Sequence, residues 1–271
     1  MSLERRLLIE QGGPGHRGPA LPACDVPMKP IEELLPGARL RESLCFPQVS
    51  EPEVVRHFIE LATLNHHVDR GLYPLGSCTM KHNPKINDEI AALPGFAAAH
   101  PLAADEHSQG ALRVLYELQR ALAAITGFAA VTTQPVAGAQ GETTGLLLIR
   151  AWHRSRGEGE RRRRVIVPDS AHGTNPASVH LAGYETSTIA SGAHATVSVE
   201  ALKGTLDDRV AAVMLTVPNT LGLFEPHILE VTRLAHEAGA QVYMDGANLN
   251  ALVGLVRPGD LGFDAMHINV H

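Results

Sequence analysis

The stretch Ala240-Gln241-Val242-Tyr243-Met244-Asp245-Gly246-Ala247-Asn248 shows the pattern that decides the fold. Its short apolar run is typical of a buried strand, and the run ends at an acid, Asp245. Comparable runs alternate along the chain, with strand-like runs near 127–133, 164–168, 184–189, 210–217 and 264–270 and helical runs near 140–156, 175–182, 199–204 and 226–238. This alternation predicts an α/β fold with a mostly parallel, doubly wound sheet and helices on both faces.

The upstream part of the chain has a different pattern. Residues 1–50 are rich in proline and glycine and show no periodicity, which predicts an extended arm lying on a partner. The capping-box pattern Ser50-x-x-Glu53 predicts a helix that reaches to about Asp69. A second helix is predicted from about Glu106 to Thr126, because leucines recur on one face and Gly127 is a typical stop signal.

The composition is that of a globular protein. Of the 271 residues, 44% are hydrophobic and 19% are charged, which allows a large domain over residues 51–271. The net charge of -6 argues against nucleic acid as a partner. Neither a run of ~20 apolar residues nor a secretory signal is present, so we expect a cytoplasmic protein without a membrane partner. The scattered Cys24, Cys45 and Cys78 indicate neither a disulfide framework nor a zinc site.

Ligands on a parallel sheet bind at the carboxyl ends of the strands, so the loops after the strands are candidate sites. The stretch from Gly138 to Thr144 opens a helix, and its small residues and the helix N-terminus suit a phosphate monoester; a plain helix start fits equally well. His172 follows the second strand-like run, where it suits stacking on a planar ring with Thr174 near ligand oxygens. Asn219 is a donor for a phenolic oxygen or, in the more ordinary interpretation, a turn residue.

Asp245 needs a partner, because an unpaired carboxylate at a buried strand end is energetically costly. A protonated pyridine nitrogen is suitable, since the ion pair keeps the ring able to accept electrons, and this arrangement is typical of pyridoxal phosphate sites. Magnesium is the rival partner, but we find no second carboxylate at a neighbouring strand end. The 15 histidines show no ligand spacing, so we expect no metal site.

Two further stretches carry unusual numbers of polar groups. Residues 73–85 form a loop rich in functional groups, which indicates a segment that lines a site. Within it, Cys78 is either a reactive thiol or a bystander, and we favour the bystander. The run Arg161-Arg162-Arg163-Arg164 is either a solvated loop or a docking surface for an acidic carrier protein.

Four stretches together resemble the glycine decarboxylase P-protein of the glycine cleavage system, and the chain looks like the second, cofactor-bearing subunit of the split bacterial form. These stretches are Tyr73–Lys85, Ala137–Glu142, Asp169–Pro176 and Asp245–Asn250. The resemblance implies the large domain of a fold-type I pyridoxal-phosphate-dependent transferase. It implies that glycine is decarboxylated on pyridoxal 5'-phosphate and that the aminomethyl group passes to the lipoyl arm of the H-protein. It also implies a hetero-oligomer with the first subunit, two copies of each.

The resemblance also implies roles for single residues. By motif position, His172 stacks on the cofactor ring, Asp245 pairs with the ring nitrogen and Ala247 packs on the opposite face. The remaining residues expected at the cofactor are Gly138, Ala139, Gln140, Glu142, Thr174 and Asn219. Those expected in the substrate and lipoyl region are Tyr73, Ser77, Cys78, His82 and Asn83.

The family places its Schiff-base lysine directly after the residue that matches His271, yet no lysine occurs after Lys203. His271 is therefore a candidate for both the catalytic and the cofactor-binding set. A sheet that ended here would leave apolar core to be covered by a further segment. We hypothesise that the sequence is a fragment that lacks the lysine and a smaller C-terminal domain.

Two other functions stay open. A different fold-type I enzyme, such as a desulfurase or an amino-acid decarboxylase, has the same kind of loops, but the stretch 73–85 favours glycine. A non-catalytic scaffold subunit fits the missing lysine. Such a subunit has no use for a buried, unpaired Asp245, which favours an enzyme.

Overall fold

The computed structural model describes residues 6–18, 20–37, 41, 46–71, 82–192 and 194–270. The chain forms two compact units, Met1–Tyr73 and Pro74–His271. The predicted division into an arm over 1–50 and a large domain over 51–271 stays a prediction. Within the described ranges, every helix is too short or too polar to span a membrane.

The first unit contains η1 (Leu8–Glu10), α1 (Ile31–Leu34) and α2 (Glu51–Ala62). Helix α2 begins at the predicted capping box: the backbone N–H of Ser50 donates to Glu53 Oε2 at 2.6 Å. That bond, the Ser50 hydroxyl and His16 lower the pKa of Glu53 to about 2. The first half of the arm folds back on this helix start, since Gly13 N–H donates to the carbonyl of Gln48 at 3.0 Å.

Helix α2 ends at Ala62 and not near Asp69, so the predicted length was wrong. The residues that follow satisfy one another in a turn: the Thr63 hydroxyl donates to the carbonyl of Glu60 at 2.7 Å. The side-chain oxygen of Asn65 accepts from the backbone of His66 at 2.9 Å. Short polar side chains of this kind compete with the helical backbone for hydrogen bonds, which ends the helix early.

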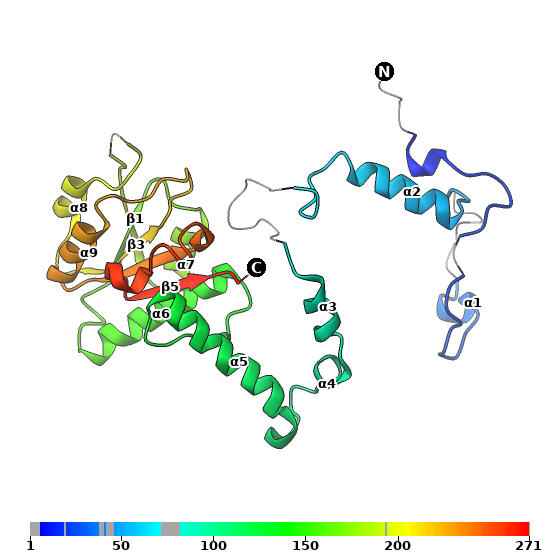
Figure 1. Ribbon diagram of the computed structural model, residues 1–271, viewed down its shortest axis with the longest axis horizontal. Helices are drawn as coiled ribbons and strands as arrows, with labels where there is room; N and C mark the ends of the chain where they lie inside the picture. The colour runs from blue at the N-terminus through cyan, green and yellow to red at the C-terminus, as the bar shows by residue number, and fades with distance from the viewer. Residues whose placement is uncertain are drawn as a thin grey trace. The chain divides into compact units, whose positions relative to one another are not determined.

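The second unit holds the sheet and most of the helices (Figure 1). Its elements are α3 (Lys85–Ala91), α4 (Pro94–Ala97), α5 (Asp105–Thr126), α6 (Gly138–Ser155), β1 (Arg164–Pro168), α7 (Thr174–Leu181), β2 (Glu185–Ile189), α8 (Val199–Thr205), β3 (Val210–Thr216), α9 (Ile228–Glu237), β4 (Gln241–Gly246), η2 (Leu249–Ala251), η3 (Pro258–Leu261) and β5 (Ala265–Ile268). The strand order is β2-β1-β3-β4-β5, and every pair is parallel. The predicted parallel, doubly wound sheet is confirmed.

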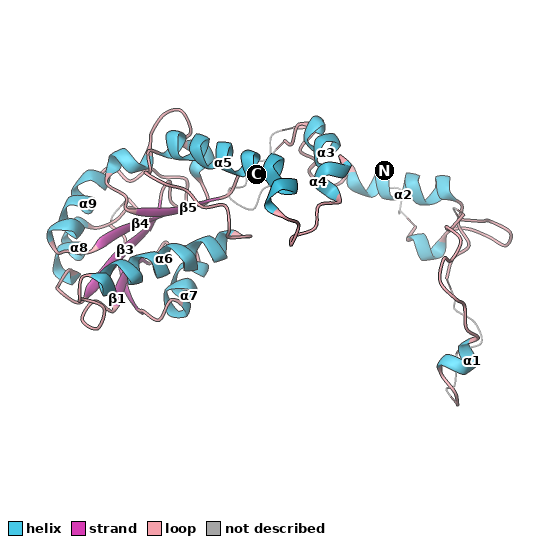
Figure 2. Cartoon of the chain, turned by 90° about the horizontal axis from the view of Figure 1, so that it is seen from below, coloured by secondary structure: helices cyan, strands magenta, loops and turns pink. Residues whose placement is uncertain are grey.

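Both faces of the sheet are buried, because β3 contributes to two cores. Val213 and Leu215 pack into a core with residues of α8 and α9, whereas Ala212 and Met214 pack into a core with residues of α6 and α7. Figure 2 shows the two helix layers on opposite sides of the strands. Successive residues of a strand point to opposite faces of the sheet, so a strand that is apolar at every position needs helices packed on both faces.

One predicted strand does not form. Residues 127–133 are irregular, and β5 is the edge strand of the described sheet on that side. A groove of about 690 Å³ separates β5 from residues 128–137, and its lining includes Phe128, Val131, Met266 and Ile268. Paired strands lie about 4.8 Å apart. Because the groove keeps residues 127–133 farther than this from β5, their backbone does not form strand hydrogen bonds with it.

The arginine run lies at the amino-terminal edge of the sheet, where the strands begin. The guanidinium of Arg162 is buried and donates to the carbonyl of Val210 at 2.7 Å and of Ala238 at 3.1 Å, and it pairs with Glu158 at 2.9 Å. Arg161 also pairs with Glu158 and Arg163 pairs with Glu160, but the side chains of both are about half exposed. Arg162 is therefore a structural residue, which neither interpretation of the run, as a solvated loop or as a docking surface, predicted.

Candidate functional site

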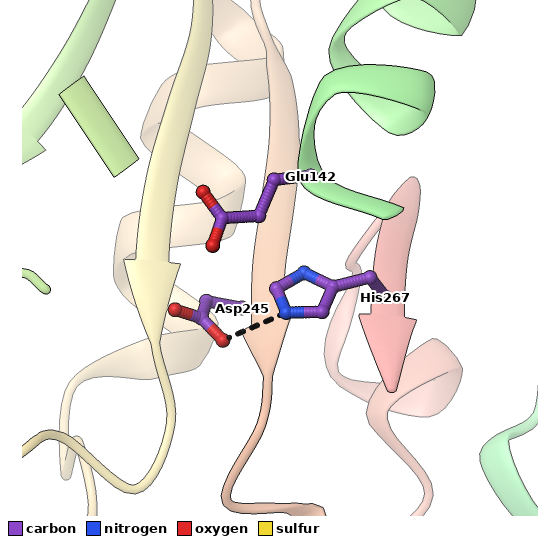
Figure 3. A group of neighbouring side chains, drawn as sticks. All are labelled: Glu142, Asp245 and His267. Carbon is purple, nitrogen blue, oxygen red and sulfur yellow. Dashed lines mark ion pairs between the residues drawn. The ribbon is translucent and has the colours of Figure 1, made fainter. Parts of the chain in front are cut away.

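Parallel register gathers three side chains at the carboxyl edge of the sheet. Thr216 of β3 pairs with Asp245 of β4, and Asp245 pairs with His267 of β5. Residues in register on adjacent parallel strands point to the same face. Asp245 therefore lies between a hydroxyl and an imidazole, and it is buried. Figure 3 shows the imidazole of His267 next to Asp245, with the ion pair between them.

Asp245 is 2% exposed and accepts hydrogen bonds on both oxygens. Its Oδ2 accepts from Asn175 Nδ2 at 3.0 Å and from the Thr216 hydroxyl at 3.3 Å. Its Oδ1 accepts from the backbone of Ala247 at 3.0 Å and lies 3.2 Å from Nε2 of His267. Burial alone raises the pKa of a carboxyl, but the donors, His267 first, outweigh it and lower the pKa of Asp245 to about 2.

His267 also meets a tyrosine. The Tyr243 hydroxyl lies 2.8 Å from Nδ1 of His267 and the two rings stack with centroids 6.0 Å apart. Burial, with the charges of Glu142 and Asp245, raises the pKa of Tyr243 far above its ordinary value, so the phenol keeps its proton. Tyr243, His267 and Asp245 thus form one hydrogen-bonded string at the sheet edge.

A second carboxylate lies beside this string. Glu142, in the first turns of α6, is 3% exposed, and its Oε1 accepts from the Thr174 hydroxyl at 2.7 Å. Its Oε2 is buried without a hydrogen-bond partner. Ligand atoms of Glu142, Asp245 and His267 lie within 4.8 Å of one another. The sequence analysis looked for a second carboxylate only at neighbouring strand ends, whereas Glu142 reaches Asp245 from the start of a helix.

His172 belongs to the same network through Thr174. The exposed His172 follows β1, and its Nδ1 lies 2.7 Å from the Thr174 hydroxyl oxygen and accepts from the Thr174 backbone at 3.2 Å. Thr174 begins α7, and the next residue, Asn175, bonds Asp245. One short helix start thus links the exposed imidazole to both buried carboxylates.

The N-terminus of α6 is open. Its N-cap residue, Ala137, provides no side-chain hydrogen bond, so the first N–H groups of an 18-residue helix are left for a ligand. Such an end carries a partial positive charge and suits an anion. Gly138 and Ala139 lie in this first turn, and the side-chain oxygen of Gln140 accepts from the backbone of Val136 at 2.8 Å.

The other predicted residues lie apart from this network or outside the described residues. Asn219 bonds the carbonyl of Ala195 at 2.9 Å and accepts from two backbone groups of its own loop, as a turn residue does. His82 and Asn83 are exposed, and Asn83 bonds Asp88 and Asn87 near the start of α3. Tyr73, Ser77, Cys78 and His271 lie outside the described residues.

Four residues of the network had no predicted role: Tyr243, Asn175, Thr216 and His267. A signal for His267 exists in the sequence, because a histidine inside an apolar run must find a buried partner. The partner itself follows only from the register of β4 and β5.

Comparisons with known proteins identify the family of the chain. The model of the glycine cleavage system P-protein family matches residues 31–268. A probable glycine dehydrogenase (decarboxylating) subunit 2 of Chloroherpeton thalassium is 54% identical over 266 residues, 98% of this chain and 54% of the relative. The protein of the same name from Halalkalibacterium halodurans is 53% identical and covers 100% of this chain and 56% of the relative. The chain spans about half the length of the curated relatives it matches.

Solved structures share the fold. The crystal structure of the glycine decarboxylase (P-protein) of the glycine cleavage system, in inhibitor-bound form, has a TM-score of 0.64 at 26% identity, over 89% of this chain and 51% of that chain. A sphingosine-1-phosphate lyase of Burkholderia pseudomallei has a TM-score of 0.52 at 18% identity, over 81% of this chain and 51% of that chain, a likeness of fold alone. The architecture is that of the fold-type I pyridoxal-phosphate enzymes. Sequence and fold together show that the chain belongs to the glycine cleavage system P-protein family.

Proposed function

We propose that this chain carries the pyridoxal phosphate site of a glycine decarboxylase, in which glycine loses carbon dioxide and its aminomethyl group passes to a lipoyl carrier, the H-protein. The observation that supports it best is Asp245, a buried carboxylate kept ionised at the carboxyl edge of a parallel sheet. The name subunit 2 of the relatives implies a second kind of subunit. We propose a cytoplasmic heterotetramer with two copies of each.

The donor set fits the cofactor at two points. An uncapped helix N-terminus at Gly138 suits the phosphate, with Ala139 and Gln140 in the same turn. A buried acceptor at Asp245 suits a protonated ring nitrogen, since an ion pair in a water-poor site is stronger than one in water. When bound, pyridoxal phosphate supplies a protonated ring that accepts the electron pair left by the departing carbon dioxide.

The residues of this chain then have distinct tasks. Asp245 holds the proton on the ring nitrogen, and Asn175 with Thr216 orients the carboxylate. His172, exposed in the loop after β1, would pack on one ring face and Ala247 on the other. The orphan Oε2 of Glu142 accepts from a donor of the cofactor or substrate, because a buried acceptor without a partner is costly.

The test uses the protein expressed from its complete gene together with its partner subunit. We expect a yellow protein whose colour borohydride bleaches, and glycine-dependent exchange of labelled carbon dioxide that requires a lipoylated carrier. Asp245→Asn should abolish exchange, while Arg233→Ala, an exposed residue of α9 that pairs only with Glu237 of the same helix among the described ion pairs, should leave it unchanged.

Each alternative has its own result. Release of sulfide from cysteine without glycine exchange identifies a desulfurase. A colourless protein that supports neither reaction identifies a scaffold subunit. Exchange that requires added magnesium and survives borohydride assigns Glu142, Asp245 and His267 to a metal ion and rejects the proposal.

A further inference from the structure

We propose that His267 is a positioning residue for the ring nitrogen of the cofactor, and that Tyr243 holds His267 in the tautomer that points its Nε2–H at Asp245. This inference rests on the proposed function, because it assigns a task towards pyridoxal phosphate. It goes further because it assigns His267 and Tyr243 the task of holding the carboxylate of Asp245 in position.

The hydrogen-bond geometry supports one arrangement of the protons. Ionised Asp245 only accepts, so the 3.2 Å contact between its Oδ1 and Nε2 of His267 places a hydrogen on Nε2. The Tyr243 hydroxyl has two acceptors in reach, Nδ1 of His267 at 2.8 Å and the carbonyl of Gly141 at 3.4 Å. Donation to the nearer Nδ1 makes that nitrogen an acceptor, which leaves the Nε2–H tautomer as the stable one.

Helix α6 is shaped around this pair. Glycines at 138, 141 and 145 share one helix face, because positions three and four apart lie above one another. A Cβ on Gly141 would lie 2.7 Å from the Cβ of His267, and a Cβ on Gly145 would lie 2.3 Å from Cε2 of Tyr243. The glycines that suggested a phosphate loop therefore also let α6 press on Tyr243 and His267, which holds both rings in place.

One of the donors around Asp245 can give up its position to a ring nitrogen. A carboxylate offers about four acceptor positions, and Asn175, Thr216, Ala247 and His267 engage them all. Only Thr216 has an alternative, since its hydroxyl also lies 3.4 Å from Oδ1 of Asn175. We infer that Thr216 turns to Asn175 when the cofactor binds, while His267 keeps its hold.

The groups that face His267 are few. Asp245 and Tyr243 come from β4, and Glu142 comes from α6, with ligand atoms of Glu142, Asp245 and His267 within 4.8 Å. Removing His267 leaves two carboxylates side by side with one donor fewer. That loss favours a proton on the acid instead of on the ring nitrogen.

The experiment measures the ring nitrogen directly. The protein from the complete gene, with its partner subunit, is loaded with pyridoxal phosphate labelled with ¹⁵N in the ring. Nuclear magnetic resonance then reports whether that nitrogen is protonated, and dialysis gives the dissociation constant. The variants are His267→Leu, which lacks a donor, His267→Gln, whose amide N–H replaces Nε2–H, and Tyr243→Phe.

His153→Asn is the matched control. His153 is as buried as His267, but its Nε2 bonds the carbonyl of Ala211, near the start of β3 and away from Asp245. This variant measures how much cofactor binding changes when a buried imidazole is removed at a distance from Asp245.

We expect a protonated nitrogen in the unaltered protein, in His267→Gln and in His153→Asn. His267→Leu should move the resonance towards the unprotonated position and weaken binding about tenfold, equivalent to ~1.4 kcal/mol. Tyr243→Phe should lower the pH at which the nitrogen loses its proton.

An unchanged resonance and dissociation constant in His267→Leu overturns the inference. If His267→Leu does not fold, the titration of Tyr243→Phe decides instead, and a titration like that of the unaltered protein is the negative result. Absence of cofactor binding in the unaltered protein rejects the proposed function itself, which a failure of the variants alone does not.

Discussion

Gly145 offers the sharpest test of how α6 and the sheet are fitted together. The residue lies in the interior of α6, where a glycine weakens a helix by about 0.5–1 kcal/mol relative to alanine. A Cβ at this position would lie 2.3 Å from Cε2, 3.2 Å from Cδ2 and 3.3 Å from Cζ of Tyr243. Carbon atoms in contact normally lie about 3.5–4.0 Å apart, so Gly145→Ala forces the ring or the helix to move.

The ring has little room to yield. Tyr243 is fully buried and its hydroxyl is held by His267 at 2.8 Å. Overpacking a core of this kind costs about 1–3 kcal/mol, and the gain in helix propensity returns about 1 kcal/mol at most. We expect Gly145→Ala to lower the free energy of unfolding by up to about 2 kcal/mol.

Gly110→Ala is the matched control. Gly110 lies in the interior of α5, and a Cβ there meets no atom within 4 Å. The same substitution should raise the free energy of unfolding by about 0.5–1 kcal/mol. Urea unfolding followed by circular dichroism measures both values. A Gly145→Ala protein as stable as Gly110→Ala, with the same denaturant slope, would refute the packing argument and the role of α6 in seating Tyr243.

Three other outcomes follow from charged groups. The pKa of Asp245 is lowered to about 2 from an ordinary 3.8, so its contribution to stability is present above pH 4 and is lost as the pH falls from 4 to 2. The contribution is about 2 kcal/mol, and urea unfolding of the unaltered protein and Asp245→Asn between pH 6 and pH 2 should show it only in the former. Asp245→Asn should itself cost about 1–3 kcal/mol at pH 7, because donors then face an amide that cannot accept from all of them, and an unchanged urea midpoint would contradict this. Arg162→Ala should cost about 3 kcal/mol by breaking a buried pair, whereas Arg163→Ala should change stability by about 0.5 kcal/mol or less; equal thermal midpoints for the two variants would show that Arg162 is solvated after all.

The periodicity of the sequence was sufficient for most of the fold. The strands β1 to β5 and the helices α5 to α9 lie where apolar repeats and stop signals predict them, with small shifts at their ends. These patterns are local, since an amphipathic helix or a strand buried on both faces has a characteristic spacing of apolar residues in the sequence. The strand expected at 127–133 shows the limit, because a strand exists only with a neighbour, and pairing is a property of distant residues.

The candidate site divides in the same way. By itself the sequence determined that Asp245 ends a buried strand, that His172 and Thr174 follow another, and that a glycine-rich helix start belongs to the same edge of the sheet. Only the tertiary structure decided which groups support Asp245: strand register brings Thr216 and His267 beside it, and α7 brings Asn175. The physical reason is that hydrogen bonds act over about 3 Å, whereas these donors come from elements 22 to 70 residues away along the chain. Such contacts follow from how strands align and helices pack, and no local period in the sequence records them.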